Sequence, residues 1–259
     1  NGTSGQYAAL SYCWGKAQTF TTTAETYVAR CRGFNLTELP QTIRDAVIVT
    51  REMGLRFLWV DAICIIQGDS ADWVAESSKM AQVYGNAAIT ICATGSPNTV
   101  SGLFGPRWTA KRDAIVVCSA CSSGGKTGTM FISARLGSVD DALDGAVLNT
   151  RAWCLQERIL SRRIIHFAED QLYWECQQCL SAEEGLVVAS GSPLKHSLRT
   201  SGSDTWPTIA RNWHIIVDAY SRRHLSHLSD KLPAVSGLGR IVHQRANTEY
   251  LAGLWREDL

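Results

Sequence analysis

The chain has 259 residues, of which 45% are hydrophobic and 19% are charged. Soluble domains usually carry about one quarter charged residues, so this composition predicts a well-filled core and not a disordered chain. Lys and Arg number 25 against 24 Asp and Glu, without a basic run, which excludes the usual kind of nucleic-acid-binding surface. No apolar run reaches the roughly 18 residues that a membrane-spanning helix needs.

The nine cysteines show no disulfide-framework spacing, and several lie in apolar segments, where a reduced cysteine packs as a small hydrophobic residue. We therefore expect a reducing compartment and a cytoplasmic protein. Two CxxC pairs occur, Cys118 with Cys121 and Cys176 with Cys179. Because 55 positions separate Cys121 from Cys176, and zinc ribbons separate such pairs by about 15–20 residues, we favour chance pairing of abundant cysteines over a zinc site and name no metal ligand.

The N-terminal part predicts a βαβ unit. Residues 7–15 (YAALSYCWG) are typical of a strand that ends in a turn. Pro40 suits the first turn of a helix that Gly54 ends. The apolar run of residues 57–66, broken once by Asp61, predicts a strand covered on both faces. Strand, helix and strand in this order make a right-handed unit of a parallel sheet.

An amphipathic helix is expected after this second strand, from about residue 71 to residue 85. Glu76 shares the apolar stripe of this helix, three residues after Trp73 and four before Met80. Open α/β sheets bind ligands at the carboxyl ends of their strands, so Glu76 is a candidate functional carboxylate. The alternatives are a solvated charge for Glu76 and a structural hydrogen bond for Asp61.

The rest of the chain continues the mixed pattern. We expect the helix of residues 151–160 to place Trp153 in the core, while Arg151 and Glu157 either pair nearby or face the same cleft as Glu76. The other predicted elements are strands at 87–93, 115–118 and 129–133, a loop at 95–110, a hairpin of 163–167 with 171–176, and helices from 206 and over 232–245.

Three blocks, in this order and spacing, resemble the fungal heterokaryon-incompatibility (HET) domain. They are YAALSYCWG at residues 7–15, the block of residues 39–86 around LWVDAICIIQ, and the block of residues 148–176 that begins LNTRAWCLQERIL. The resemblance covers roughly residues 7–185. The tail resembles the segment that follows this domain in large HET proteins.

The resemblance implies an α/β fold with a flavodoxin- or TIR-like parallel sheet flanked by helices, an added β-hairpin region and a C-terminal helical extension. It divides the chain into a HET domain at 1–185, a linker at 186–205 and a helical extension at 206–259. We expect the chain to be a fragment of a longer protein.

It also implies a cell-death-inducing domain of fungal self/non-self recognition and innate immunity. The expected partners are other copies of the chain and other incompatibility or NLR-type proteins.

Remote similarity of the family to TIR domains, several of which hydrolyse NAD, suggests an NAD(P) glycohydrolase in which Glu76 is catalytic. No resident cofactor is expected, because NAD would be the substrate. Cleavage passes through an oxocarbenium-like ribose that a carboxylate can stabilise. The candidate binding residues are Tyr12, Trp14, Gly15, Arg44, Asp61, Arg151 and Glu157.

Two other functions stay open. The domain could be a signalling and oligomerisation module without chemistry, with Trp108 and the loop of residues 95–110 as contact points. It could also be a cysteine hydrolase built from Cys13, Cys64 or Cys154 with His166. The apolar surroundings of these cysteines argue against the hydrolase.

Overall fold

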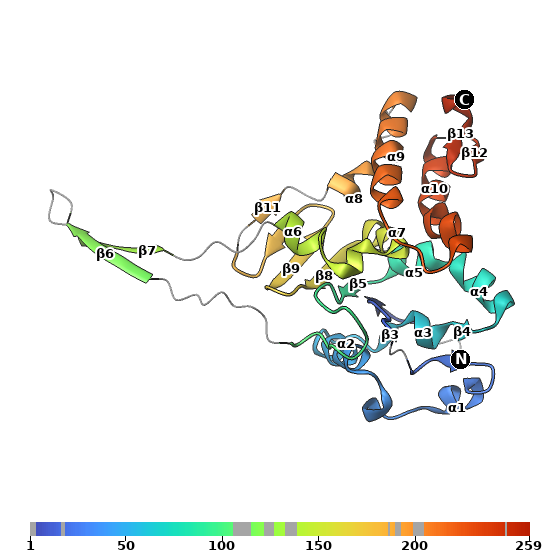
Figure 1. The fold of residues 1–259 in the computed structure, drawn as a ribbon, viewed down its shortest axis with the longest axis horizontal. Helices are drawn as coiled ribbons and strands as arrows, with labels where there is room; N and C mark the ends of the chain where they lie inside the picture. Colours follow the sequence, from blue (N-terminus) through green and yellow to red (C-terminus); the bar gives the residue numbers. More distant parts are fainter. Residues whose placement is uncertain are drawn as a thin grey trace.

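The computed structural model describes residues 4–16, 19–105, 115–121, 127–132, 139–185, 187–189, 193–198, 205–246 and 248–259. A seven-stranded sheet runs through the molecule in the order β11-β10-β9-β8-β5-β1-β3 (Figure 1). Four neighbouring strands are parallel, and the other three continue the sheet in antiparallel pairs. The parallel strands are β1 (Tyr7–Ser11), β3 (Phe57–Trp59), β5 (Ile89–Cys92) and β8 (Arg163–Phe167); the antiparallel ones are β9 (Leu172–Cys176), β10 (Leu180–Ala182) and β11 (Val187–Ala189).

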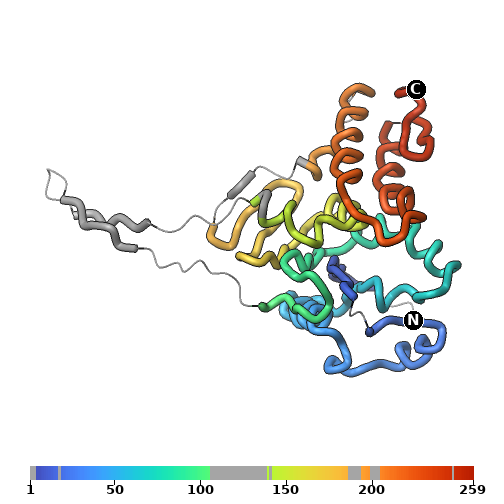
Figure 2. The backbone as a smooth tube through the Cα atoms, viewed as in Figure 1, coloured from blue at the N-terminus to red at the C-terminus, as the bar shows by residue number. Residues whose placement is uncertain are grey.

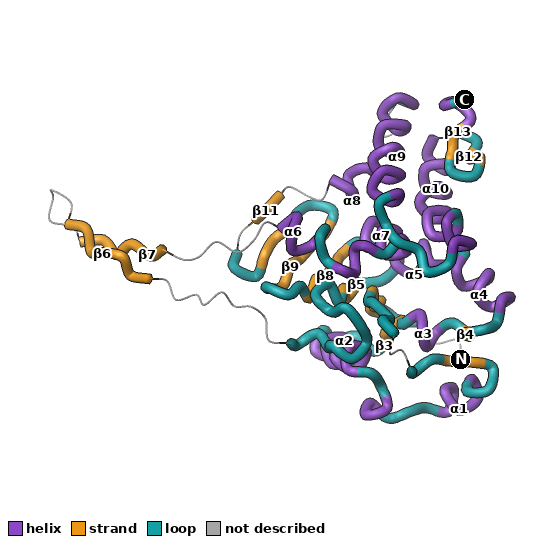
Figure 3. Tube along the Cα trace, in the orientation of Figure 1, coloured by secondary structure: helices purple, strands orange, loops and turns teal. Residues whose placement is uncertain are grey.

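The parallel strands follow the flavodoxin-like order, in which the first strand lies between the second and the third. Strands β1 and β3 flank helix α2 (Gln41–Glu52) in sequence and pair in parallel, so the predicted βαβ unit is confirmed. The predicted hairpin of β8 and β9 is confirmed as well, in the register Arg163↔Cys176. The fold is therefore the expected α/β class, with a mainly parallel sheet flanked by helices (Figure 3).

Alternate residues of β1 pack on opposite faces of the sheet, as the period of two in a strand requires. Ala8 and Leu10 belong to the core on the α2 side, with Ile43 of that helix. Ala9 instead packs with Tyr84 of α5 (Met80–Asn86) on the other face. Helix α7 (Ala152–Leu160) lies on this second face as well, where Cys154 packs in a cluster with Cys13 and Cys92.

The predicted long strand at residues 57–66 is wrong in its second half. Strand β3 ends at Trp59, and a one-turn helix, α3 (Asp61–Cys64), follows it. The backbone N–H groups of Ile63 and Cys64 donate to the carbonyl of Val60 and form this turn, of which Asp61 is the first residue. The carboxylate of Asp61 accepts the N–H of Ala62 at 2.7 Å, and so pairs a donor that the first turn of a helix leaves free. The chain then returns to an extended form in β4 (Ile66–Gln67), which pairs with β2 (Thr22–Thr23).

The predicted helix over residues 71–85 is two helices, α4 (Ser70–Ser77) and α5. Asp69 caps the start of α4 by accepting the N–H groups of Ala71 and Asp72. At its end, the hydroxyls of Ser77 and Ser78 donate to the carbonyls of Val74 and Ala75. Such local side-chain hydrogen bonds compete with the helical ones, which explains the break.

The C-terminal helices share one core with the α/β domain. Residues of α9 (Trp206–Ser221) and α10 (Pro233–Ala246) pack with Ala152, Leu155 and Ile159 of α7. The backbone N–H of Gly237 donates to the side chain of Gln156 at 3.0 Å. The two long helices stand side by side above α7 (Figure 1), so the predicted helical extension is continuous with the domain in packing.

The remaining elements are short. The interval 186–205, predicted as a linker, contains β11 and α8 (Pro193–Ser197). Figure 2 follows the chain from its first strand to its last helical turn. The other elements are α1 (Tyr27–Arg32), α6 (Val139–Leu143), the 3₁₀ turns η1 (Leu36–Glu38), η2 (Val147–Thr150), η3 (Leu228–Lys231) and η4 (Arg256–Asp258), and the strand pairs β6 (Ile115–Cys121) with β7 (Thr127–Ile132) and β12 (Tyr250–Leu251) with β13 (Leu254–Trp255).

Trp108 lies outside the described residues. Within the described ranges, no helix combines the length and the apolar character that crossing a membrane requires.

Candidate functional site

A cavity of about 410 Å³ opens beyond the carboxyl ends of β1 and β3. Its walls come from the loops after these strands, from α4 and α7, and from the segment between α9 and α10. The volume lies within the range of small-molecule sites, roughly 300–1,000 Å³. In open α/β sheets this edge is the usual place for a ligand.

Asp61 lies at the wall of the cavity because it comes two residues after the end of β3. One carboxylate oxygen accepts the indole N–H of Trp14 at 2.9 Å, and the other accepts the N–H of Ala62. Burial raises the pKa of Asp61, while the charge of Arg151 and these hydrogen bonds oppose that rise. The carboxyl is thus tightly held and borders the cavity.

Arg151 precedes the first residue of α7 and points its guanidinium back toward the sheet. It donates to the backbone carbonyl of Tyr12, at the end of β1. Burial alone would lower the pKa of Arg151, but the nearby Cys154, Glu157 and Asp61 raise it overall. Arg151 is therefore a fixed positive charge among acidic groups.

Glu157 lies two turns along α7 and is buried, at 6% exposed. Its carboxylate accepts the hydroxyl of Ser11 at 2.5 Å, which ties α7 to the end of β1. Burial raises the pKa of Glu157; Arg151 and the hydrogen bond from Ser11 oppose this rise, and the charge of Asp61 adds to it. Two carboxyl groups thus share the field of one guanidinium at the cavity.

Aromatic side chains form much of the rest of the wall. The rings of Trp73 on α4 and Trp153 on α7 meet edge to face, with centroids 6.5 Å apart. The indole N–H of Trp153 donates to Asp230 at 3.0 Å. Trp14 lines the cavity as well, so flat ligand groups would meet aromatic surfaces here.

The segment after α9 closes the site from the C-terminal side. The backbone of His224 bonds to both neighbours of Arg151: its N–H donates to Thr150 at 2.7 Å, and its carbonyl accepts the N–H of Ala152 at 2.9 Å. His227 and Asp230 complete this wall. The helical extension therefore contributes directly to the cavity.

Four of the predicted site residues come together at the cavity: Trp14, Asp61, Arg151 and Glu157. Tyr12 is not among the residues that line the cavity. Its ring packs in the core on the α2 side, and its side chain hydrogen-bonds to Asp61, which does line the cavity. The prediction that Trp153 is a core residue is true only in part, because its ring also faces the cavity.

The other three predicted residues lie elsewhere. Gly15 has φ +64°, and a Cβ there would come within 2.5 Å of Asn98, so it serves the turn. Arg44 donates to the carbonyl of Leu39 at 2.9 Å, beside the start of α2.

Glu76 is on α4 but is not among the residues that line the cavity. It forms an ion pair with Lys79, one turn further on, at 2.7 Å. Its neighbours Trp73 and Ser77 do line the cavity. The catalytic role of Glu76 stays a prediction.

Sequence reasoning missed the residues of the C-terminal wall, such as His224 and Asp230, since nothing local connects them with α7. Trp73 could have been found, because it lies three residues before the candidate Glu76 on the same stripe of the helix. Trp153 precedes the candidate Glu157 by one helical turn, so this spacing also indicated that the two side chains share one face of the helix.

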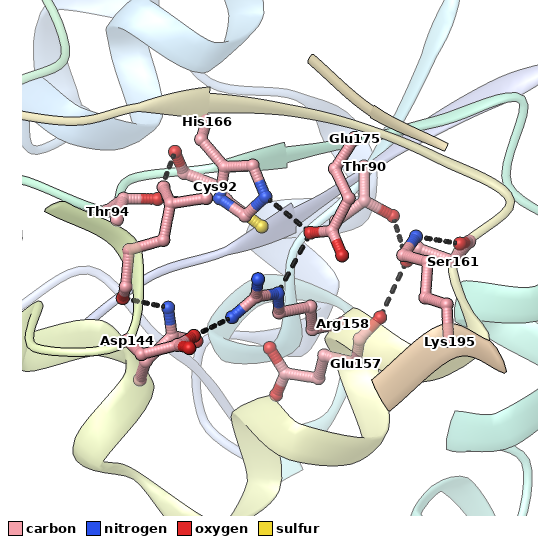
Figure 4. Close-up of polar contacts among 12 residues, drawn as sticks. Thr90, Cys92, Thr94, Asp144, Glu157, Arg158, Ser161, His166, Glu175 and Lys195 are labelled. Carbon is pink, nitrogen blue, oxygen red and sulfur yellow. Dashed lines mark hydrogen bonds and ion pairs between the residues drawn. The ribbon is translucent and has the colours of Figure 1, made fainter. Parts of the chain in front are cut away.

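A separate network of buried charges lies where α7 packs on β8 and β9 (Figure 4). One oxygen of Glu175 accepts from Arg158 and from His166, both at 2.8 Å. Arg158 also reaches Asp144, and His166 contacts Thr94 through its other ring nitrogen at 3.0 Å. Burial lowers the pKa of His166 and thus favours the neutral ring, although Glu175 opposes the shift. These contacts link helix and sheet in the domain core.

The network also bears on the cysteine-hydrolase alternative. The hydrogen bonds of His166 go to Thr94 and Glu175, and burial raises the pKa of Cys13, Cys64 and Cys154. Protonated thiols are poor nucleophiles. Among the described residues, no group of three or more His, Cys, Asp or Glu side chains is placed to hold a metal ion.

The fold and the cavity define an α/β domain of flavodoxin-like strand order with a small-molecule-sized site at its sheet edge. Residues 7–157 match the family described as heterokaryon incompatibility protein (HET). The chain belongs to this family, which implies a role in heterokaryon incompatibility. No curated protein and no solved structure gives a significant match.

Proposed function

We propose that this domain induces cell death in incompatibility by hydrolysing the nicotinamide–ribose bond of NAD or a related nucleotide in the cavity. The observation that carries the proposal is the placement of Asp61 and Glu157 around Arg151 in an aromatic-walled cavity at the sheet edge. Trp14, Trp73 and Trp153 supply surfaces on which a base can stack.

Departure of nicotinamide needs no general acid. The bond from ribose C1′ to the pyridinium nitrogen breaks, its electron pair neutralises the ring, and nicotinamide leaves without needing a proton. Positive charge develops on the ribose, which a nearby carboxylate stabilises. Water then adds at C1′ and gives up a proton, for which the second carboxylate is the acceptor.

Arg151 favours the ionised forms of Asp61 and Glu157. Burial raises the pKa of both carboxyl groups, and the positive charge of Arg151 opposes the rise in each. Glu76, the carboxylate first expected to be catalytic, is one turn from Trp73 and Lys79 and would need to turn from Lys79 to reach a bound ribose.

The test is incubation of the purified protein with NAD and with NADP, following nicotinamide release by chromatography. Asp61→Asn, Glu157→Gln and Glu76→Gln are compared with Glu52→Gln, a change at an exposed position on α2. The assay is run at high protein concentration, because we propose that the domain acts as an assembly of several copies.

Nicotinamide release by the wild type that Asp61→Asn or Glu157→Gln reduces at least a hundredfold supports the proposal and locates its site. Loss of nicotinamide release in Glu76→Gln alone would place the catalytic carboxylate on α4. If a folded, concentrated sample releases no nicotinamide while the same chain still kills fungal cells, the enzymatic proposal fails and a signalling module is the better description.

A further inference from the structure

The turn between β9 and β10 holds two cysteines face to face. Cys176 and Cys179 flank the two turn residues Gln177 and Gln178, and the N–H of Cys176 donates to the carbonyl of Cys179 at 2.9 Å. The next pair along the ladder is Glu175 with Leu180. The two sulfur atoms are 3.7 Å apart, and both residues are partly exposed.

The two sulfurs have different surroundings. The backbone N–H of Gln178 points at the sulfur of Cys176 at 3.4 Å, and the N–H of Cys179 and the side chain of Trp174 also donate to it. Burial alone would raise the pKa of Cys176, but these hydrogen bonds lower it overall. The hydrogen bond to Cys176 raises the pKa of Cys179. Cys176 is thus suited to act as an attacking thiolate, and Cys179 as the thiol that reacts in a second step.

The other cysteines with described side chains lack this combination. Burial raises the pKa of Cys13, Cys92 and Cys154, which lie together in the core, and it also raises the pKa of Cys64. Cys31 is exposed and lies 145 positions before Cys176 in the chain (176 − 31). The chain therefore offers an exposed single thiol for comparison with the pair.

We propose that Cys176 and Cys179 form a redox-active dithiol that small-molecule disulfides, such as oxidised glutathione, convert reversibly to a disulfide. The sulfur of Cys176 attacks one sulfur of oxidised glutathione, whose S–S bond breaks and releases one glutathione thiolate. The thiol of Cys179 then loses its proton and attacks the sulfur of Cys176, which releases the second glutathione. Two thiols of the protein lose two electrons and two protons, and one oxidised glutathione becomes two reduced ones.

The geometry of the turn permits this bond. Cys176 and Cys179 come directly after the paired residues Glu175 and Leu180 and are joined by one backbone hydrogen bond, and residues opposite each other in antiparallel strands have Cα atoms about 4.5–5.5 Å apart. That separation lies inside the range of about 4.4–6.8 Å that disulfides span. The sulfurs need only close from 3.7 Å to a bond length of about 2.05 Å, a movement that side-chain rotation supplies. The closed loop is short and partly exposed, so the disulfide is readily reduced.

The experiment exposes the protein to oxidised glutathione, blocks remaining thiols with N-ethylmaleimide, and maps the peptide that spans β9 and β10 by mass spectrometry. In the wild type we expect this peptide without maleimide and lighter by two hydrogen atoms, with reversal by dithiothreitol. In Cys179→Ser the reaction stops halfway, and Cys176 carries one glutathione. Cys176→Ser takes up glutathione at Cys179 at least tenfold more slowly than the wild type reacts.

Cys31→Ser serves as the control and leaves the pair unchanged. Circular dichroism of each variant checks the fold, so that a loss of reactivity is not mistaken for unfolding. A mixed disulfide that persists on Cys176 equally in the wild type and in Cys179→Ser would overturn the proposal. It would also fail if the pair stays reduced in oxidised glutathione, and zinc that co-purifies with the chain would then identify the two sulfurs as metal ligands. Neither result depends on nicotinamide release, so this test is independent of the proposed hydrolysis.

Discussion

Trp14 donates its indole N–H to Asp61 at 2.9 Å, and this hydrogen bond joins the loop after β1 to the first turn after β3. Neighbouring parallel strands end at the same edge of the sheet, so two residues 47 positions apart meet there. Because the other oxygen of Asp61 accepts the N–H of Ala62, the carboxylate is fixed in direction. One side of the cavity is therefore shaped by the sheet itself.

This relationship predicts energetic coupling between the two residues. Trp14→Phe keeps an aromatic ring but removes the donor, and Asp61→Asn keeps the shape but removes the charge. Hydrogen bonds to charged groups contribute about 1.5–3 kcal/mol, so we expect a coupling of about 1.5 kcal/mol in a double-mutant cycle. Urea unfolding of the four proteins measures it. Strictly additive effects would show that the bond contributes nothing.

The buried network around Glu175 predicts a large loss of stability. Glu175→Gln leaves Arg158 buried next to a neutral amide, and breaking a buried ion pair costs about 3–5 kcal/mol. The matched control is Asp218→Asn, which breaks the exposed pair of Asp218 with Arg222 on α9 and should change little. Urea unfolding compares both. Equal effects of the two changes would contradict the structural role of the network.

His166 makes part of this stability depend on pH. Its pKa in the folded protein lies below the ordinary 6.5, chiefly because of burial. Below pH 6.5 the unfolded chain therefore binds a proton that the folded chain does not, so this contribution to stability is present at pH 7 and is lost as the pH falls.

Comparison with His166→Gln isolates this effect. The variant lacks the titrating ring, so the stability advantage of the wild type should shrink between pH 7 and pH 5. Urea unfolding at several pH values tests this. An advantage that stays constant or grows in acid would mean that the folded protein binds the proton as readily as the unfolded chain.

Much of the fold could be predicted from the sequence, because its main signals are local. Pro40 and the left-handed Gly54, with φ +72°, bracket α2 as expected. The apolar pattern around residues 163–176 predicts the hairpin that β8 and β9 form. The prediction of one strand at residues 57–66 failed for a local reason too. A run of apolar residues does not reveal that the carboxylate of Asp61 accepts the N–H of the next residue.

The site was less predictable, because its parts come from segments far apart in sequence. Trp14 and Asp61 follow strands, and for that reason they could be predicted at the sheet edge. The bond between Trp153 and Asp230 spans 77 positions, and no periodicity in either segment indicates it. Helical spacing placed Glu76 on the apolar stripe of its helix, but its position at the edge of that stripe allows the pairing with Lys79.

The last prediction concerns the packing contact between α7 and α10. The C-terminal wall of the cavity depends on how closely these two helices pack. A Cβ at Gly237 would meet the methyl of Ala81 at 2.7 Å and would also collide with the side chain of Gln156, which accepts the N–H of Gly237. We expect Gly237→Val to lower the free energy of unfolding by about 2 kcal/mol, in the range of overpacking.

Arg240→Val, at an exposed position on the same helix, is the control for the poor helix propensity of valine. Because α10 would move away from α7, the contact of Trp153 with Asp230 should loosen as well, and tryptophan fluorescence should shift to the red in Gly237→Val but not in Arg240→Val. If the two variants unfold at the same urea concentration and with the same spectrum, the close packing of α10 on α7 does not support the cavity wall.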